Sequence, residues 1–405
     1  MNIQGIDHVE FYVADARQAA GQLCAAYGFR VDGEGGPHTG LPGQRSVLVR
    51  LPGIRILLTA GLSADHPATR YVARHGDGVA VVALATDDAS AAFTEAVRRG
   101  AEPLAHPVVY EQGITRVTFA SVSGFGDVAH RFVQRRGPDE EFAPGVIQRQ
   151  PSGSAAPGGR PPGIPPQESM PHPRQPFRTN ADSDTADGDG GEDILDVIDH
   201  IAACVPAGTL DAVVQAYDDI FGFTQIFEER IEVGGQAMDS KVVQSPSGEV
   251  TLTLLEPVVS ADPGQIDDFL RSHDGAGVQH VAFRTSDIAE AVRILEKRGV
   301  QFLATPPAYY DALERRLGAA ELPLQELRAL NVLADRDPWG LMFQIFTQSV
   351  HPRRTFFFEL IERRGALTFG TGNIRALYEA VAREHAAAAP PPAPGDRPGA
   401  TPSDT

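Results

Sequence analysis

Two stretches of the chain repeat the same order of apolar strands and amphipathic helices. "GIDHVEFYVADARQAAGQLCAAYGF" near the start matches "VIDHIAACVPAGTLDAVVQAYDDIFGF" after residue 196, and "ATDDASAAFTEAVRRGAEPLAHP" matches "RTSDIAEAVRILEKRGVQFLATP". Each stretch predicts a strand and a helix followed by hairpin-like strands, then a second strand and helix followed by further strands. The chain is therefore predicted to hold a duplicated βαβββ arrangement.

The helix after residue 286 illustrates how the pattern sets its limits. Asp287 can cap the first turn with Glu290 three residues on, and Gly299 ends the helix. Its expected buried stripe consists of Ile288, Val292 and Leu295. The first copy has the same pattern, with Phe93 and Val97 before Gly100.

Two segments lack this apolar periodicity. Residues 137–192 and 387–405 are rich in Pro, Gly, Ser, Ala and Asp, and we expect a disordered linker and a disordered tail there. Two folded domains remain, at 1–136 and 193–386. We predict an α+β protein with two domains, in each of which paired βαβββ units form a curved open barrel around a ligand cup.

Composition narrows the class of protein. The 405 residues carry a formal charge of −18, which argues against nucleic acid or an anionic membrane as a partner. No run of 18 apolar residues predicts a membrane span, and the N-terminus does not look like a secretory signal. With only Cys24 and Cys204, a disulfide framework is not expected, so we predict a cytoplasmic protein.

Three residues of the second repeat suggest chemistry: His200 in "VIDHIAA", His280 in "GVQHVAF" and Glu359 in "TFFFELIERRG". A single histidine in a strand is more often a hydrogen-bonded core residue. Glu359 is harder to explain in that way, because an unpaired carboxylate on an apolar strand face costs several kcal/mol, on the order of other buried charges. Arg363 and Arg364 are expected to pair with Glu362 instead.

Two imidazoles and one carboxylate are the ligand set of non-haem Fe(II) sites, which leave open positions for substrate and O₂. The wide spacing suits three different strands and excludes local zinc-finger or HExxH geometry. The first repeat keeps His8 but has Val81 at the second position, and its linker is expected to begin where a counterpart of Glu359 would fall. We therefore expect a structural first domain, with His8 a core or interface histidine.

The motifs "IDHIA", "GAGVQHVAF", "LMFQIFTQSVHPR", "FFFELIERRGA" and "FGTGNIRALYEAV" resemble the 4-hydroxyphenylpyruvate dioxygenase family of the vicinal oxygen chelate superfamily. Within that family the chain is more similar to the branch that forms 4-hydroxymandelate. The homogentisate-forming branch typically shows Pro-x-Asn-Glu where this chain has Thr253-Leu254-Leu255-Glu256, and Phe where it has Ile374.

The resemblance implies Fe²⁺ held by His200, His280 and Glu359, and a substrate, 4-hydroxyphenylpyruvate, that reacts with O₂ to give 4-hydroxymandelate and CO₂ without added 2-oxoglutarate. It also implies a supply of hydroxyphenylglycine for a peptide antibiotic, and a homodimer as one assembly. Gln344, Gln279 and Ser240 are the implied catalytic residues, although isolated glutamines are more often ordinary surface or edge-strand residues. The implied substrate-binding residues are Ser240, Thr253, Leu255, Gln265, Gln279, Gln344, Phe369, Asn373 and Ile374.

Three alternatives stay open. One is a dioxygenase of tyrosine catabolism that makes homogentisate, and another is a vicinal oxygen chelate protein that sequesters a drug without chemistry. The third is a lyase or isomerase with a fourth metal ligand. Glu256 is the only tempting candidate for that ligand, and its position before Pro257 at a strand end argues against it.

Overall fold

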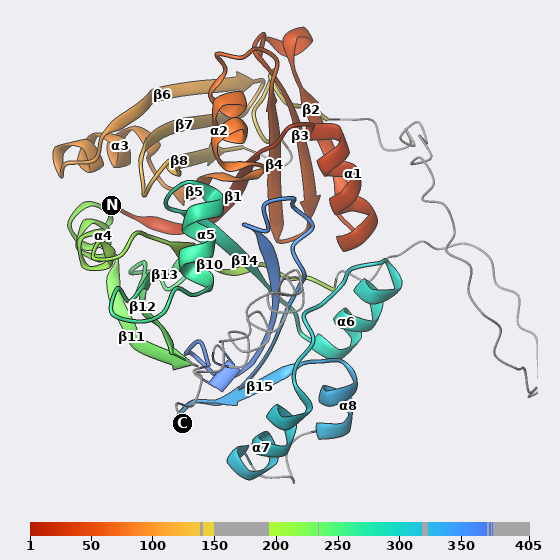
Figure 1. Cartoon of the computed structure of the whole chain (residues 1–405). Helices are drawn as coiled ribbons and strands as arrows, with labels where there is room; N and C mark the ends of the chain where they lie inside the picture. The colour runs from red at the N-terminus through yellow and green to blue at the C-terminus, as the bar shows by residue number, and fades with distance from the viewer. Residues whose placement is uncertain are drawn as a thin grey trace, which may run out of the picture.

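The computed structural model describes residues 1–137, 141–149, 194–233, 235–317, 323–370, 372–373 and 375. Its two halves each consist of one strongly curved mixed sheet with helices packed on the outside (Figure 1). The predicted α+β class and the two barrel-like domains are therefore confirmed.

The first half follows the predicted strand–helix order. Within the described residues its sheet has the order β6-β7-β8-β5-β1-β4-β3-β2-β9. Its elements are β1 (Ile3–Tyr12), α1 (Ala16–Tyr27), β2 (Arg30–Gly35), η1 (Pro37–Thr39), β3 (Gln44–Leu51), β4 (Ile54–Gly61), α2 (Pro67–His75), β5 (Gly78–Thr86), α3 (Ala89–Arg98), β6 (Pro103–Gln112), β7 (Thr115–Ser123), β8 (Ala129–Arg136) and β9 (Gln148–Arg149).

The second half repeats this order and adds helices before its last hairpin. Within the described residues its sheet has the order β11-β12-β13-β10-β14-β17-β16-β15. Its elements are β10 (Ile198–Cys204), α4 (Leu210–Ala216), η2 (Tyr217–Phe221), β11 (Thr224–Val233), β12 (Gln236–Gln244), β13 (Thr251–Pro257), α5 (Gln265–His273), β14 (Gly277–Arg284), α6 (Ile288–Lys297), α7 (Pro307–Leu317), α8 (Leu324–Ala329), β15 (Leu333–Arg336), β16 (Leu341–Phe346) and β17 (Phe357–Arg364).

In each half, two βαβββ units join through their first strands. β1 pairs antiparallel with β5, and β10 pairs antiparallel with β14. Each of these strands pairs on its other side with the last strand of its own unit in parallel: β1 with β4, β5 with β8, β10 with β13 and β14 with β17. The four central strands of the second sheet thus bring residues distant in sequence onto one face.

The α6 helix has the limits that its sequence predicts. The Asp287 side chain accepts a hydrogen bond from the Glu290 amide, and Ile288, Val292 and Leu295 are buried. Gly299 adopts a φ of 91°, a conformation that favours glycine, and ends the helical segment. By contrast, the sequence did not lead us to expect α2 and α5, which connect the two units of each half.

The first half extends past the boundary that we placed at residue 136. Residues 141–149 pack back onto its sheet, where β9 pairs with β2 and the Phe142 and Ile147 side chains are buried against Leu48 and Leu57. Ala143 and Val146 join the same cluster, so this short stretch carries enough apolar surface to pack against the sheet. The remainder of the expected linker, together with residues 376–386 and the expected tail at 387–405, lies outside the described residues.

The two halves share a continuous apolar core. The Phe11 and Phe356 rings meet edge-on with 5.0 Å between their centres, and the Tyr27 and Phe358 rings meet with 4.9 Å between theirs. The His130 ring bonds the Tyr217 hydroxyl across the same interface at 2.7 Å. No helix in the described part of the chain is both long and apolar enough to cross a membrane.

Candidate metal centre and substrate cup

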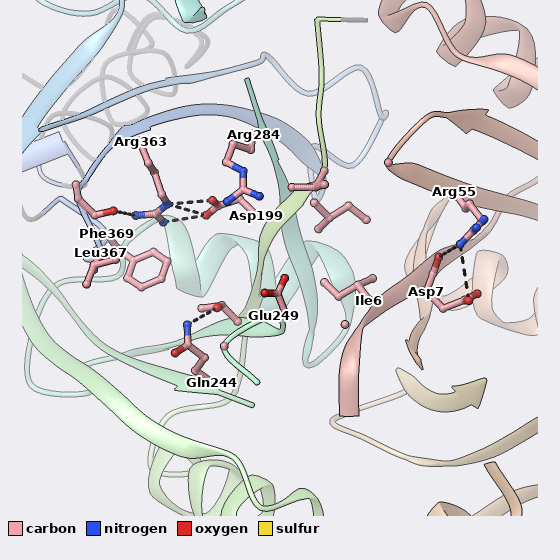
Figure 2. A pocket seen from close by; sticks show the side chains of 17 residues that line it. Ile6, Asp7, Arg55, Asp199, Gln244, Glu249, Arg284, Arg363, Leu367 and Phe369 are labelled. Atoms are coloured by element: carbon pink, nitrogen blue, oxygen red, sulfur yellow. Dashed lines mark hydrogen bonds and ion pairs between the residues drawn. The ribbon is translucent and has the colours of Figure 1, made fainter. Parts of the chain in front are cut away.

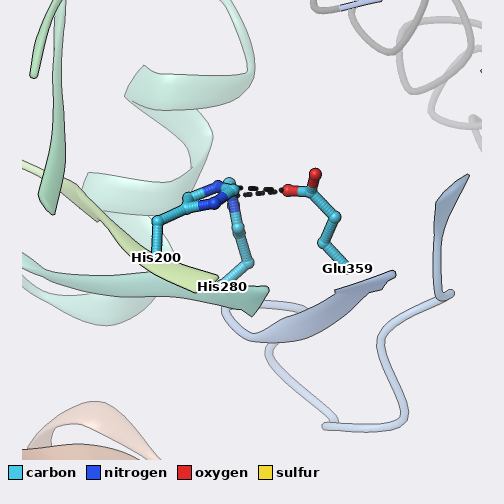
Figure 3. A group of neighbouring side chains, drawn as sticks. All are labelled: His200, His280 and Glu359. Atoms are coloured by element: carbon cyan, nitrogen blue, oxygen red, sulfur yellow. Dashed lines mark ion pairs between the residues drawn. The ribbon is translucent and has the colours of Figure 1, made fainter. Parts of the chain in front are cut away.

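The three predicted ligands converge from the three adjacent strands β10, β14 and β17. His200 lies beside Ala282 on β14, which in turn lies beside Glu359 on β17. Glu359 Oε2 is 3.4 Å from His200 Nε2 and 3.2 Å from His280 Nε2 (Figure 3). One potential ligand atom from each residue lies within 4.8 Å of the others, and all three side chains are buried. The predicted set therefore forms one cluster.

Strand irregularities place a hydrogen-bond partner behind each imidazole. The β10–β14 ladder shifts register at Asp199 and again opposite Gln279, so each of these residues lies beside the histidine that follows it. Asp199 Oδ1 is 3.0 Å from His200 Nδ1, and Gln279 Oε1 is 3.3 Å from His280 Nδ1. Because both oxygens accept, each Nδ1 carries the proton and each Nε2 is free to face Glu359.

Electrostatics in the cluster favour a cation. Burial opposes charge on His200, yet Glu359 and Asp199 raise its pKa to about 9. Burial likewise opposes charge on Glu359, but the two imidazoles lower its pKa to about 2. Burial lowers the pKa of His280. In the protein alone, a proton on His200 thus balances the carboxylate, and a divalent ion can replace that proton. Two neutral imidazoles and one carboxylate suit Fe(II).

The second oxygen of Glu359 belongs to a side-chain network. Gln344 Nε2 donates to Glu359 Oε1 at 2.7 Å, and Asn373 Nδ2 donates to Gln344 Oε1 at 2.8 Å. The Tyr309 hydroxyl completes the chain by bonding Asn373 Oδ1 at 2.7 Å. Sequence reasoning selected Gln344 and Asn373 but missed Tyr309, because α7, which carries it, has no counterpart in the first repeat.

The predicted substrate residues Ser240, Thr253 and Leu255 line the same face of the sheet as His200. The register pairs Thr253 with Ala202, two residues from His200, and Ser240 with Leu255. The Thr253 hydroxyl is buried and has no hydrogen-bond partner among the described residues. A buried hydroxyl without a partner is costly, so Thr253 is well suited to bond a ligand in the cup.

An apolar cluster on the same face of the sheet lies against α5. Leu255 packs there with Ile266 and Phe269 of that helix and with Cys204 and Met238 of the sheet.

The other predicted substrate residues occupy different places. Gln265 is the half-buried first residue of α5, and Phe369 meets the His200 ring edge-on at 5.1 Å. Ile374 lies outside the described residues.

The first half lacks this centre for one expected and one unexpected reason. Val81 pairs with Glu10 as His280 pairs with Ala202, so Val81 takes the position of the second candidate ligand as predicted. The position of Glu359 is filled differently from our expectation. The parallel β5–β8 pairing puts Arg131 beside Ala83, as β14–β17 puts Glu359 beside Ala282. The counterpart of Glu359 is therefore Arg131, on a strand that precedes the linker. Its Nη1 lies 3.2 Å from His8 Nε2, and the side chain pairs with buried Glu10 at 2.7 Å. His8 is fully buried, as predicted for a core histidine.

Three other charged residues have roles that the structure specifies. Glu256 caps α4 by accepting hydrogen bonds from the Thr209 and Leu210 amides at 3.0 and 2.9 Å, so it is no fourth ligand. Arg364 pairs with Glu362 as expected, but Arg363 does not. Its guanidinium instead binds Asp199, and both side chains line the same pocket (Figure 2).

Family models cover most of both halves. Residues 1–143 match the N-terminal part of hydroxyphenylpyruvate dioxygenase, and residues 197–345 match the glyoxalase/bleomycin resistance protein/dioxygenase superfamily. Together with the paired βαβββ units and the convergent ligands, these matches define a vicinal oxygen chelate protein.

Full-length relatives narrow the family. The 4-hydroxyphenylpyruvate dioxygenase of Yarrowia lipolytica is 30% identical over 95% of this chain and 92% of its own length. The 4-hydroxyphenylpyruvate dioxygenase of Dictyostelium discoideum is 30% identical over 94% of this chain and 98% of its own length. The chain belongs to the 4-hydroxyphenylpyruvate dioxygenase family.

Solved structures agree with this family assignment. A triple mutant of 4-hydroxymandelate synthase from Streptomyces coelicolor has a TM-score of 0.79 and 39% identity, covering 95% of this chain and 100% of that one. A fusion of a xylose isomerase-like TIM barrel with 4-hydroxyphenylpyruvate dioxygenase has a TM-score of 0.67 at 23% identity, covering 94% of this chain and 53% of that one, and supports the fold alone.

Proposed function

We propose that this protein is an Fe(II)-dependent dioxygenase that converts 4-hydroxyphenylpyruvate and O₂ into 4-hydroxymandelate and CO₂. The observation that carries the proposal is the buried convergence of His200, His280 and Glu359 in a chain of this dioxygenase family. The similar solved protein that bears the name 4-hydroxymandelate synthase supports the particular product.

The described residues fit the metal. When bound, ferrous iron would supply the chelation of the 2-oxo acid and the activation of O₂. His200, His280 and Glu359 would hold it, each through an atom that already faces the common centre. Gln344 keeps Glu359 Oε1 occupied, which leaves Oε2 as the ligand atom.

Other side chains of the cup would orient the substrate. The Thr253 hydroxyl, which is unpaired within the residues that the structure describes, offers a hydrogen bond close to the strands of the candidate ligands. The Phe369 ring covers one side of His200 and limits the approach of water. Ser240, Gln265 and Gln279 remain candidate contacts for the polar ends of the substrate, with Gln279 also holding His280.

The choice between the two products would be positional. Oxidation of the benzylic carbon gives 4-hydroxymandelate, whereas oxidation of the ring gives homogentisate. A misplacement of about 1 Å can cost about a hundredfold in rate, so a small shift of the ring suffices. Leu255 lies in an apolar cluster and offers no hydrogen bond to the ring. The absence of a hydrogen bond from Leu255 supports a placement of the substrate ring that differs from its placement in a site with Asn at position 255.

Product analysis tests the proposal. The two products are isomers, so ring-deuterated substrate is incubated with air and enzyme that was loaded with Fe(II) under anaerobic conditions. 4-Hydroxymandelate should keep every ring deuterium, whereas homogentisate loses one. The curated relatives are named 4-hydroxyphenylpyruvate dioxygenase, which makes homogentisate the second candidate. Loss of a deuterium would favour it.

Two further outcomes complete the test. Absence of O₂ consumption with substrate and bound Fe(II) would reject both enzymes and favour a sequestering protein. Formation of 4-hydroxymandelate would support the further proposal that the protein supplies a precursor of 4-hydroxyphenylglycine for a nonribosomal peptide antibiotic.

A further inference from the structure

Arg363 links a metal ligand to the segment that lines the cup. Its guanidinium donates to Asp199 Oδ1 at 2.8 Å and to Oδ2 at 2.9 Å, and Asp199 in turn holds His200 Nδ1 at 3.0 Å. The same guanidinium lies 5.2 Å from the centre of the Phe369 ring. Since Phe369 also meets the His200 ring, the four side chains form a closed loop of contacts, of which Figure 2 shows Arg363, Asp199 and Phe369.

Arg363 also fixes the backbone between β17 and Phe369. Its Nη1 donates to the carbonyl oxygens of Ala366 and Thr368 at 3.3 and 2.8 Å. The side chain is largely buried, with 14% of its surface exposed, and Asp199 is more buried at 6%. A planar guanidinium can satisfy these partners at once, whereas an ammonium cannot reproduce the fork and the stacking together.

The first half contains the same arrangement. Arg135 donates to Asp7 Oδ2 and Oδ1 at 2.7 and 2.8 Å, and Asp7 Oδ1 lies 2.6 Å from His8 Nδ1. Arg135 Nη1 bonds the Glu141 and Phe142 carbonyl oxygens at 3.3 and 2.7 Å. Its guanidinium lies 5.0 Å from the Phe142 ring, which meets His8 edge-on at 4.7 Å.

The two halves differ in the group that faces the histidine Nε2 atom. His8 Nε2 faces the Arg131 guanidinium, whereas His200 Nε2 faces Glu359 and the candidate metal position. The four-residue arrangement therefore does not require the metal ligands. In the second half, however, the histidine that it holds is itself a ligand.

We propose that Arg363 is a positioning residue that fixes the orientation of His200 toward the metal and ties it to the placement of Phe369 in the cup. This inference rests on the metal site of the proposed function. It predicts that loosening Arg363 weakens both metal binding and substrate binding. A purely structural role would lower only the stability of the fold.

The matched pair R363Q and R135Q separates these roles, because each removes the same set of contacts from one half. We expect similar losses of thermal stability in both variants. Co²⁺ titrations, followed by calorimetry and by the visible spectrum of the bound ion, should show a dissociation constant raised about 10- to 100-fold in R363Q, the size seen when partners of metal ligands are removed. R135Q should retain the wild-type affinity and spectrum. Steady-state kinetics of the Fe(II) enzyme should show a raised KM in R363Q alone.

A second variant protects the test against loss of folding. R363K keeps the charge, so it should fold while losing the fork and the stacking, and we expect a weakened Co²⁺ affinity that is intermediate between wild type and R363Q. Equal Co²⁺ affinities and spectra in wild type, R363K and R135Q would overturn the inference. If the wild-type protein itself bound no metal, the proposed function would fail instead, and the two failures are thus distinguishable.

Discussion

Arg131 occupies the position in the first sheet that Glu359 occupies in the second. Each residue pairs in parallel with an alanine of the neighbouring strand, Ala83 in one case and Ala282 in the other. Arg131 directs its guanidinium at His8 Nε2, the counterpart of the nitrogen that faces the candidate metal. The first half therefore has the guanidinium of its own Arg131 at the position where the second half can bind a metal ion.

This relationship predicts the effect of removing Arg131. R131M leaves Glu10, which is 3% exposed, without its cation, and removal of one partner of a buried pair typically costs about 3–5 kcal/mol. We expect the free energy of unfolding to fall by about this amount in urea titrations. Metal affinity and turnover should remain at wild-type values, because the second half is unchanged.

The double variant E10Q/R131M is the control for that assignment. Glutamine keeps the hydrogen bond that the Thr59 hydroxyl donates to Glu10 Oε1 and removes the unpaired charge. It should recover a large part of the lost stability. If the double variant were as unstable as R131M, lost packing rather than the charge would be the cause.

A second prediction concerns Gln344. In Q344A, Glu359 loses the donor at Oε1 and becomes free to rotate, so we expect metal affinity to fall about 10- to 100-fold. Calorimetric titration with Fe(II) or Co²⁺ measures the change. Q348A provides a control, because Gln348 lies just beyond the same strand and its side-chain amide donates to the Phe302 carbonyl oxygen. Unaltered affinity in Q344A would remove Gln344 from the metal site.

The sequence predicted the repeated strand–helix order and the cluster of candidate ligands, because both leave local signals. The repeated βαβββ pattern sets the strand order, and His200 and His280 occur in matching strand motifs. The partners of these ligands were harder to predict. Asp199 precedes His200 in sequence, yet its contact with that ring depends on a register shift that residue types alone do not reveal.

Arg363 shows a second limit of the sequence. It follows Glu362 closely, which suggested a local ion pair, but its actual partner lies 164 positions away. The choice depends on which side of the strand each residue faces and on the curvature of the sheet. Such contacts follow from tertiary packing and not from spacing along the chain.

A third prediction concerns the buried hydroxyl of Thr253. T253V removes a buried hydroxyl that has no hydrogen-bond partner in the described part of the chain, so stability should stay the same or rise by about 1 kcal/mol. KM for 4-hydroxyphenylpyruvate should rise if this hydroxyl bonds the substrate. T251V is the matched control on the same strand, because the Thr251 hydroxyl accepts a hydrogen bond from Gln244 and its loss should lower stability. Unchanged KM in T253V would exclude the contact.

The last prediction concerns pH and His130, a fully buried residue at the interface of the halves. Burial lowers the pKa of His130 to about 4, below its ordinary value of about 6.5. Between these values the unfolded chain binds a proton that the folded protein does not, so stability falls as the pH decreases from about 6.5 toward 4. The contribution of one such histidine is about 1.4 kcal/mol per pH unit.

Urea titrations across this window should show a shallower pH dependence in H130Q than in wild type. H106Q, which changes an exposed histidine, should keep the wild-type slope. A wild-type slope in H130Q would mean that folding does not lower the pKa of His130.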